Sequence, residues 1–209
     1  MKLSIAEGLY LIALDDEEGR LLAAAEKTYI DAVLSAVILE LYILKKITLT
    51  DSVIKVVDTT GTGNLVMDKV LHKLHSGQRF LDEIQNLHDY FKDVKDDLDE
   101  LLVHRGILRR EETKLLWIPL SERMDNANYA FEQEIRNMLQ AMVFKSAKAP
   151  QAFIILLSLI FDCGIIDEVF KNKDDLIDAV KVAKDIINSP ELEPEVARIL
   201  GELRSYFGK

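Results

Sequence analysis

The spacing of apolar residues predicts a long amphipathic helix in the middle of the chain. From Phe80 onward, apolar residues recur every three or four positions, at Phe80, Ile84, Leu87, Phe91, Val94, Leu98 and Leu101. This spacing places them on one face of an α-helix. We expect the helix to break near His88 and to end at Gly106, because glycine commonly follows the last turn of a helix.

Other apolar segments predict a helical core. The segment from Tyr29 to Lys46 carries apolar residues on more than one face, which is typical of a buried helix. The segment Ala152–Ile166 is the most apolar, but Asp162 ends its uncharged part well short of the roughly 20 residues that a membrane-spanning helix needs. We therefore expect a buried core helix there. Further helices are expected over residues 126–148, 150–163, 174–188 and 194–207.

Three segments predict extended structure. "LYLIAL" and "LLAAA" flank the polar turn "DDEEGR", and we expect a short hairpin closed at Gly19. "ITLTDSVIKVV" is rich in β-branched residues and is expected to be extended. "KLLWIPLSERM" is expected to form a second hairpin. These patterns together predict a mainly α protein, a single helical domain over residues 1–209 with small β-hairpins.

Charge and cysteine content narrow the classes of partner and compartment. The 209 residues carry a formal net charge of −10, and a chain this acidic is a poor general binder of nucleic acid. The single cysteine, Cys163, favours a reducing compartment. The apolar N-terminal run is interrupted by Glu7 and followed by acidic residues 15–18, which argues against a secretory signal. We expect a cytoplasmic protein, either free or peripheral at a membrane.

The stretch "VVDTTGTGNLVMDKVLHKL" has the layout of a phosphate-binding loop, with a β-branched run, Gly61 and Gly63, and then a helix pattern. A Walker loop needs lysine and serine or threonine after the glycines, and a dinucleotide fingerprint needs a third small residue. Both are missing. We favour a sharp helix entrance in which Thr62 or Asn64 caps a helix that begins near Leu65. No nucleotide binding is expected.

Other candidate chemistry is sparse. Asp68, His72 and His75 lie at positions i, i+4 and i+7, on one helix face that could hold a metal ion. No further ligand group is evident, so a solvated face is favoured. Cys163 stands among apolar residues and is expected to be buried and inert. No nucleophile signature appears. We therefore expect no metal, no cofactor and no enzymatic activity.

The order of helix, turn, basic corner and hairpin over residues 96–120 is also the order of a winged helix. A recognition helix needs basic residues, whereas this one carries acidic residues at Asp93, Asp96, Asp97, Asp99 and Glu100. We therefore expect no nucleic-acid partner. A protein-contact module of this shape stays open.

Lys92 and Lys95 are neighbours on the predicted long helix, just off its apolar stripe. Aspartates surround them. The pair forms either a solvated, salt-bridged face or a site for an anion.

Both faces of the second predicted hairpin are apolar near its turn. Alternation directs Leu116 and Ile118 to one face and Leu115 and Trp117 to the other. One face can pack on the domain, and the other then meets a membrane interface or another subunit, unless the whole hairpin folds into the core. We expect these residues to contact a membrane or a subunit, in a monomer or in a homo-oligomer formed through residues 114–120.

An ordered series of segments resembles one protein family. "SIAEGLYLIALDDEEG" is similar to an opening apolar strand with an acidic turn, and "AVILELYILKKITL" to a first long helix with Glu40 between apolar residues. "TGNLVMDKVL" and "DVKDDLDELLVHRGIL" are similar to a helix entrance and to a later long helix with its closing turn. From about Leu3 to Leu200, the chain resembles the Golgi phosphoprotein 3 family.

The resemblance implies a mostly helical fold of a peripheral membrane protein. Eukaryotic members bind phosphatidylinositol 4-phosphate and hold glycosyltransferase tails at the Golgi. Their headgroup pocket uses a tryptophan and three arginines, whose positions fall on Ala25, Leu34, Lys92 and Lys95. The lysines keep the charge but lose the bidentate geometry of arginine.

We therefore expect a peripheral membrane or adaptor protein that binds anionic phospholipid headgroups through Lys92 and Lys95, with protein clients as further partners. The alternative is a soluble protein–protein interaction module without lipid binding.

Overall fold

The structure is a computed structural model that describes residues 3–15, 18–115, 118–145 and 150–208, the side chains of residues 112–122 and 145 excepted. It is mainly helical, with two antiparallel hairpins among these residues. In chain order, the elements are α1 (Ile5–Ala13), α2 (Ala23–Glu26), α3 (Tyr29–Ile43), β1 (Ile47–Thr50), β2 (Val53–Val56), α4 (Leu65–Lys73), α5 (Phe80–His88), η1 (Asp89–Phe91), α6 (Val94–His104), β3 (Leu108–Leu115), β4 (Ile118–Asn126), α7 (Tyr129–Lys145), α8 (Gln151–Asp162), α9 (Ile166–Val169), α10 (Lys173–Asp185), η2 (Ile186–Asn188) and α11 (Pro194–Phe207).

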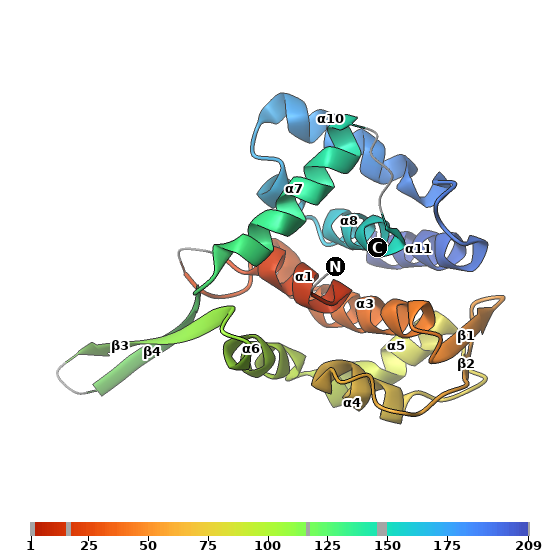
Figure 1. The fold of residues 1–209 in the computed structure, drawn as a ribbon, viewed down its shortest axis with the longest axis horizontal. Coiled ribbons are helices and arrows are strands. Elements are labelled where there is room, and N and C mark those ends of the chain that lie inside the picture. Colours follow the sequence, from red (N-terminus) through yellow and green to blue (C-terminus); the bar gives the residue numbers. More distant parts are fainter. Residues whose placement is uncertain (1–2, 16–17, 116–117, 146–149, 209) are drawn as a thin grey trace.

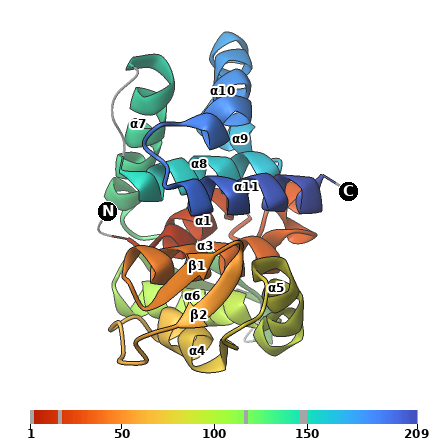
Figure 2. The ribbon, with the colours of Figure 1, turned by 90° about the vertical axis from the view of Figure 1, so that its right-hand side faces the viewer.

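The helices form layers around α1 and α3. Helices α4, α5 and α6 lie on one side of this central pair, and α8 and α11 lie on the other (Figures 1 and 2). Every residue of α1 is buried, and α3 is buried on all sides over most of its length. Helices that are apolar all round belong in the interior of a protein. The predicted central helix and the predicted core helix at α8 are therefore confirmed.

The predicted hairpin around Gly19 is wrong, because the first apolar run forms helix α1 instead of a strand. A short apolar run that is buried on every side does not distinguish strand from helix. The deciding signal is a capping box. Ser4 Oγ accepts from the Glu7 backbone N–H at 3.1 Å, and the Ser4 N–H donates to the Glu7 carboxylate at 2.8 Å. Of the expected pairing, the described residues keep an isolated bridge between Leu14 and Leu21, with backbone hydrogen bonds from Asp15 to Arg20 and from Leu22 to Ala13.

The apolar stripe from Phe80 to Leu101 faces the core, as predicted. Leu98 is fully buried. The predicted break is confirmed, because α5 ends at His88 and α6 begins only at Val94, with the short helix η1 between them. Gly106 follows α6 with φ +67°, a left-handed conformation that suits glycine.

Strands β3 and β4 form a two-stranded arm that projects from the helical body (Figure 1). The predicted hairpin is confirmed in its backbone and starts earlier than expected. One face of the arm carries opposite charges across the strands: Arg109 lies 2.6 Å from Asp125, and Arg123 lies 2.7 Å from Glu111. Such cross-strand pairs favour this register.

The base of the arm is fixed by the turn at Gly19. The Gly19 carbonyl accepts from the Met124 N–H at 3.1 Å. Gly19 has φ +63°, and a Cβ atom there would clash with the Met124 carbonyl and lie 2.8 Å from the Arg123 Cβ. Glycine is therefore required by both its conformation and its close approach to β4.

Candidate functional site

The glycine loop is a helix entrance, as predicted. The Asn64 side chain caps α4 by accepting from the N–H groups of Val66 and Met67. The N–H and hydroxyl of Thr62 both donate to one Asp68 oxygen, at 2.6 and 2.7 Å. Partial burial opposes ionisation of Asp68, but these bonds from Thr62 leave its pKa below the usual value. These polar groups of the loop thus stabilise its turn and the start of α4.

Asn64 also connects the loop to a buried charge. Its amide donates to the Glu7 carboxylate at 3.0 Å, and the Arg105 guanidinium donates to the other Glu7 oxygen at 2.7 Å. Ser4 supplies a third donor. We call Ser4, Glu7, Asn64 and Arg105 the Glu7 network. It joins the start of α1 to the start of α4 and the end of α6.

A second carboxylate lies near the start of α1. Glu40 of α3 accepts from the Ile5 N–H at 2.6 Å. Burial, with a smaller contribution from the charge of Glu7, raises the pKa of Glu40 to about 7, against the lowering effect of the Ile5 bond.

The three residues considered as metal ligands do not share a free site. Asp68 is bonded to Thr62, and His75 lies beyond α4 with its Nδ1 3.0 Å from Glu83. Among the described residues, no cluster of three histidine, cysteine or acidic side chains is suitably placed for a metal ion.

Cys163 is buried, as predicted. Burial raises the pKa of its thiol to about 11, so little reactive thiolate forms near neutral pH.

The two candidate headgroup lysines have different surroundings. Lys92 is 62% exposed and lies 2.9 Å from Asp89. Lys95 is turned toward the core, where its ammonium lies 2.6 Å from the buried Asp99 and 5.9 Å from the centre of the Tyr10 ring. The two lysines therefore do not point at one common anion site in this conformation.

The other two headgroup positions implied by the family resemblance carry apolar residues. Ala25 and Leu34 are both buried in the core.

The buried Asp99 has a second partner besides Lys95, because the hydroxyl of Tyr10 donates to it. Burial and the neighbouring Asp99 raise the pKa of Tyr10 well above its ordinary value, so it remains a neutral donor.

Leu115, Leu116, Trp117 and Ile118 are the residues predicted to contact a membrane or a subunit. Residues 116 and 117 lie outside the described residues, as do the side chains of Leu115 and Ile118. Only the backbone pairing of Leu115 with Ile118 is described. Their expected contact with a membrane or subunit remains a prediction.

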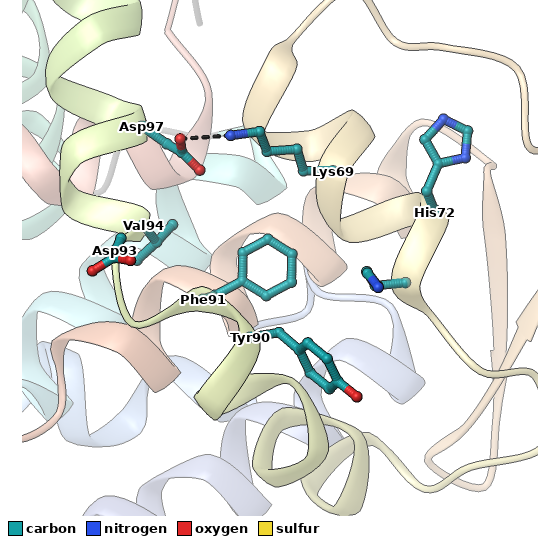
Figure 3. A pocket seen from close by; sticks show the side chains of 8 residues that line it. Lys69, His72, Tyr90, Phe91, Asp93, Val94 and Asp97 are labelled. Carbon is teal, nitrogen blue, oxygen red and sulfur yellow. Dashed lines mark hydrogen bonds and ion pairs between the residues drawn. The ribbon is translucent and has the colours of Figure 1, made fainter.

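A pocket of about 520 Å³ opens between α4 and the segment formed by η1 and α6 (Figure 3). Phe91 and Val94 are buried and form its apolar floor. Its other lining residues are polar or aromatic: Lys69, His72 and Lys73 on α4, and Tyr90, Asp93 and Asp97 on the facing segment. Sequence reasoning missed this pocket because its two walls are about 20 residues apart in the chain. The signal that was available is Tyr90, an aromatic residue off the buried stripe.

The structure thus defines a mainly helical protein with a pocket lined by charged residues between α4 and α6 and a projecting arm. Among the described residues, no helix combines the length and apolar character needed to cross a membrane. The family model described as Golgi phosphoprotein 3 (GPP34) matches residues 5–203. The chain therefore belongs to the Golgi phosphoprotein 3 family, which is not known as a family of enzymes. No curated protein matches the chain.

Proposed function

We propose that this protein is a peripheral membrane adaptor that binds anionic phospholipid surfaces without catalysing a reaction. The observation that carries the proposal is the arm formed by β3 and β4, which extends beyond the helical body (Figure 1). The sequence that connects β3 to β4 is apolar and includes the only tryptophan, Trp117. Tryptophan is favoured at membrane interfaces because its ring is amphipathic.

Electrostatic attraction in this proposal is local and weak. The whole chain has a charge of −10, so most of its surface repels an anionic bilayer. Lys92 is exposed and can exchange its partner Asp89 for a lipid phosphate, because a solvated ion pair contributes little. Lys95 provides a second positive charge, but its ammonium is paired with Asp99. Binding should therefore be sensitive to salt.

The proposed lipid preference is for negative charge rather than for phosphatidylinositol 4-phosphate. The positions that correspond to a tryptophan and an arginine in the resemblance are the buried Ala25 and Leu34. Lysine at positions 92 and 95 provides point charges but cannot bind phosphate through two parallel hydrogen bonds, as arginine does. A headgroup with several phosphates thus has no dedicated set of arginines in this proposal.

A second candidate function is a protein–protein interaction module without lipid binding. The pairing of both lysines with aspartates favours it. In that case the arm tip would contact a client protein or a second copy of the chain. Neither candidate function involves binding to nucleic acid.

Co-sedimentation with vesicles tests the proposal. We expect binding to vesicles that contain phosphatidylserine or phosphatidylglycerol, and little binding to pure phosphatidylcholine vesicles. Lys92→Glu should weaken this binding severalfold. Lys171→Glu is the matched control, because Lys171 is 69% exposed and pairs with Glu168 three residues away, just as Lys92 pairs with Asp89. Equal loss in both variants would show that Lys92 is not a specific contact, and no binding to anionic vesicles by the unmodified protein would favour the interaction module.

A further inference from the structure

The pocket between α4 and α6 has two rows of opposite charge. Lys69 and Lys73 are four residues apart on α4, and Asp93 and Asp97 are four residues apart at the start of α6. Residues at this spacing lie on one face of a helix. The pocket therefore has a cationic wall and an anionic wall, with Phe91 and Val94 as the apolar floor between them.

One pair of opposite charges across the pocket is closed. The Lys69 ammonium lies 2.6 Å from the Asp97 carboxylate (Figure 3). This contact connects α4 to α6 across the pocket. His72 lies further along α4, and its ring points away from Phe91 (Figure 3).

The other pair is open. Lys73 makes no ion pair with any described residue, and its ammonium lies 5.0 Å from the centre of the Tyr90 ring instead. Asp93, likewise, has no ion pair within the described part of the chain. The Tyr90 side chain is 69% exposed, and an exposed contact between a cation and a ring is weak. Lys73 can therefore leave the ring for a stronger anionic partner at little cost.

We propose that this pocket binds a small zwitterion with a primary ammonium and a phosphate group, the oxyanion on Lys73 and the ammonium on Asp93. Such a ligand completes the open pair as Lys69 and Asp97 complete the closed one. The four charged side chains of the two walls sum to zero. The two carboxylates repel a ligand with several phosphates, and the two lysines repel a simple cation. A pocket of this volume is within the usual range for small-molecule sites.

The same chemical group occurs as free phosphoethanolamine and as the headgroup of phosphatidylethanolamine. The pocket opens to solvent beside the exposed Tyr90, so both sources are sterically allowed. This proposal does not rest on attraction to anionic membranes, because phosphatidylethanolamine has no net charge and free phosphoethanolamine, with a net charge of about −1 near neutral pH, is not a membrane component. Failure of binding to anionic vesicles therefore leaves it intact.

An NMR titration of the isotope-labelled full chain tests the proposal. The probes are phosphoethanolamine, inorganic phosphate and ethanolamine. We expect saturable shifts of backbone signals on α4 and η1 with phosphoethanolamine. Its dissociation constant should be at least about tenfold lower than that of either half, because one tether joins two charged contacts.

Variants decide whether the open pair is the binding group. Lys73→Met and Asp93→Asn should each raise the dissociation constant for phosphoethanolamine about tenfold, the range for loss of one charged hydrogen bond. Neither residue makes an ion pair among the described residues, so both variants should fold. The controls are Lys173→Met and Asp175→Asn, two exposed charges on α10, which should change nothing.

The proposal is overturned if phosphoethanolamine causes no saturable shift at millimolar concentration, if either half binds as well, or if Lys73→Met and Asp93→Asn bind normally. Vesicles then identify the source of the ligand. Co-sedimentation with phosphatidylethanolamine vesicles, absent with phosphatidylcholine and lost in Asp93→Asn, assigns the headgroup. Binding of the soluble probe alone assigns the free compound.

Discussion

The Glu7 network and the pocket between α4 and α6 place basic side chains opposite carboxylates, but with different outcomes. In the network, Glu7 is fully buried and both of its oxygens accept hydrogen bonds, one of them from Arg105. In the pocket, Lys69 and Asp97 are paired while Lys73 and Asp93 stay open. A buried charge must be paired when the chain folds, whereas a solvated charge can stay unpaired at little cost. Buried pairs therefore serve stability, and open pairs are available to ligands.

Stability should depend most on the apolar core that underlies both regions. Leu98 lies on α6 and is fully buried. In the sequence it follows Asp97 of the pocket and precedes Arg105 of the Glu7 network. Leu98→Ala should lower the free energy of unfolding by about 2–5 kcal/mol, because it removes buried apolar surface and leaves a cavity. Urea denaturation followed by far-UV circular dichroism measures this. A change near zero would place the stripe at the surface and contradict the layering described.

Breaking the Glu7 network should have the next largest effect. Arg105→Ala leaves the buried Glu7 carboxylate without its cation. We expect a loss of about 2–3 kcal/mol, below the range for a fully buried pair because Arg105 is partly exposed. Arg198→Ala is the control, since Arg198 and its partner Asp51 are exposed and its second contact, Glu195, lies 3.6 Å away. Its loss should be much smaller than that of Arg105→Ala. Equal losses in the two variants would remove the distinction between buried and solvated pairs.

Glu40 should make stability depend on pH. Its pKa is about 7 in the folded chain, against an ordinary value of 4.5, so the folded state binds more protons between these values. The free energy of unfolding should therefore fall as pH rises from about 4.5 to 7. Glu40→Gln should remove roughly 1–2 kcal/mol of this fall, after allowance for partial exposure. Denaturation of both proteins at pH 5 and pH 8 measures the difference, and parallel pH profiles would contradict the assignment.

Solvent-exposed charges should matter least for stability, whether unpaired like Lys73 or in an exposed ion pair like Lys92. Lys73→Met and Lys92→Glu should each change the free energy of unfolding by less than about 0.5 kcal/mol, because neither side chain is buried. The same denaturation curves test this. A loss above about 1 kcal/mol in either variant would show that these lysines hold the fold together.

Sequence patterns predicted the fold where one helix face alone carries the signal. The stripe from Phe80 to Leu101 and the helix entrance at Asn64 are local patterns, and both are confirmed. The run before Gly19 misled because it is short as well as buried on all faces, so neither its period nor its length separates a strand from a helix, unlike the longer runs at α3 and α8. Its capping box, Ser4 and Glu7, was visible in the sequence and would have indicated a helix.

The candidate site was less predictable, because its geometry depends on how helices pack. Lys92 and Lys95 are close in sequence, yet packing leaves one in solvent and turns the other toward Asp99. The open pair of Lys73 and Asp93 comes from α4 and from the start of α6. No local pattern in one segment reveals that the other segment lies opposite.

The fluorescence of Trp117 tests the proposed membrane function most directly, because this residue is the only tryptophan and lies in the sequence that connects β3 to β4. In protein shown to be monomeric, anionic vesicles should shift its emission to the blue. Salt should reverse the shift, and Lys92→Glu should reduce it while Lys171→Glu does not. An emission spectrum that stays unchanged across anionic vesicles would contradict membrane insertion of the arm and leave the protein-interaction module as the better account.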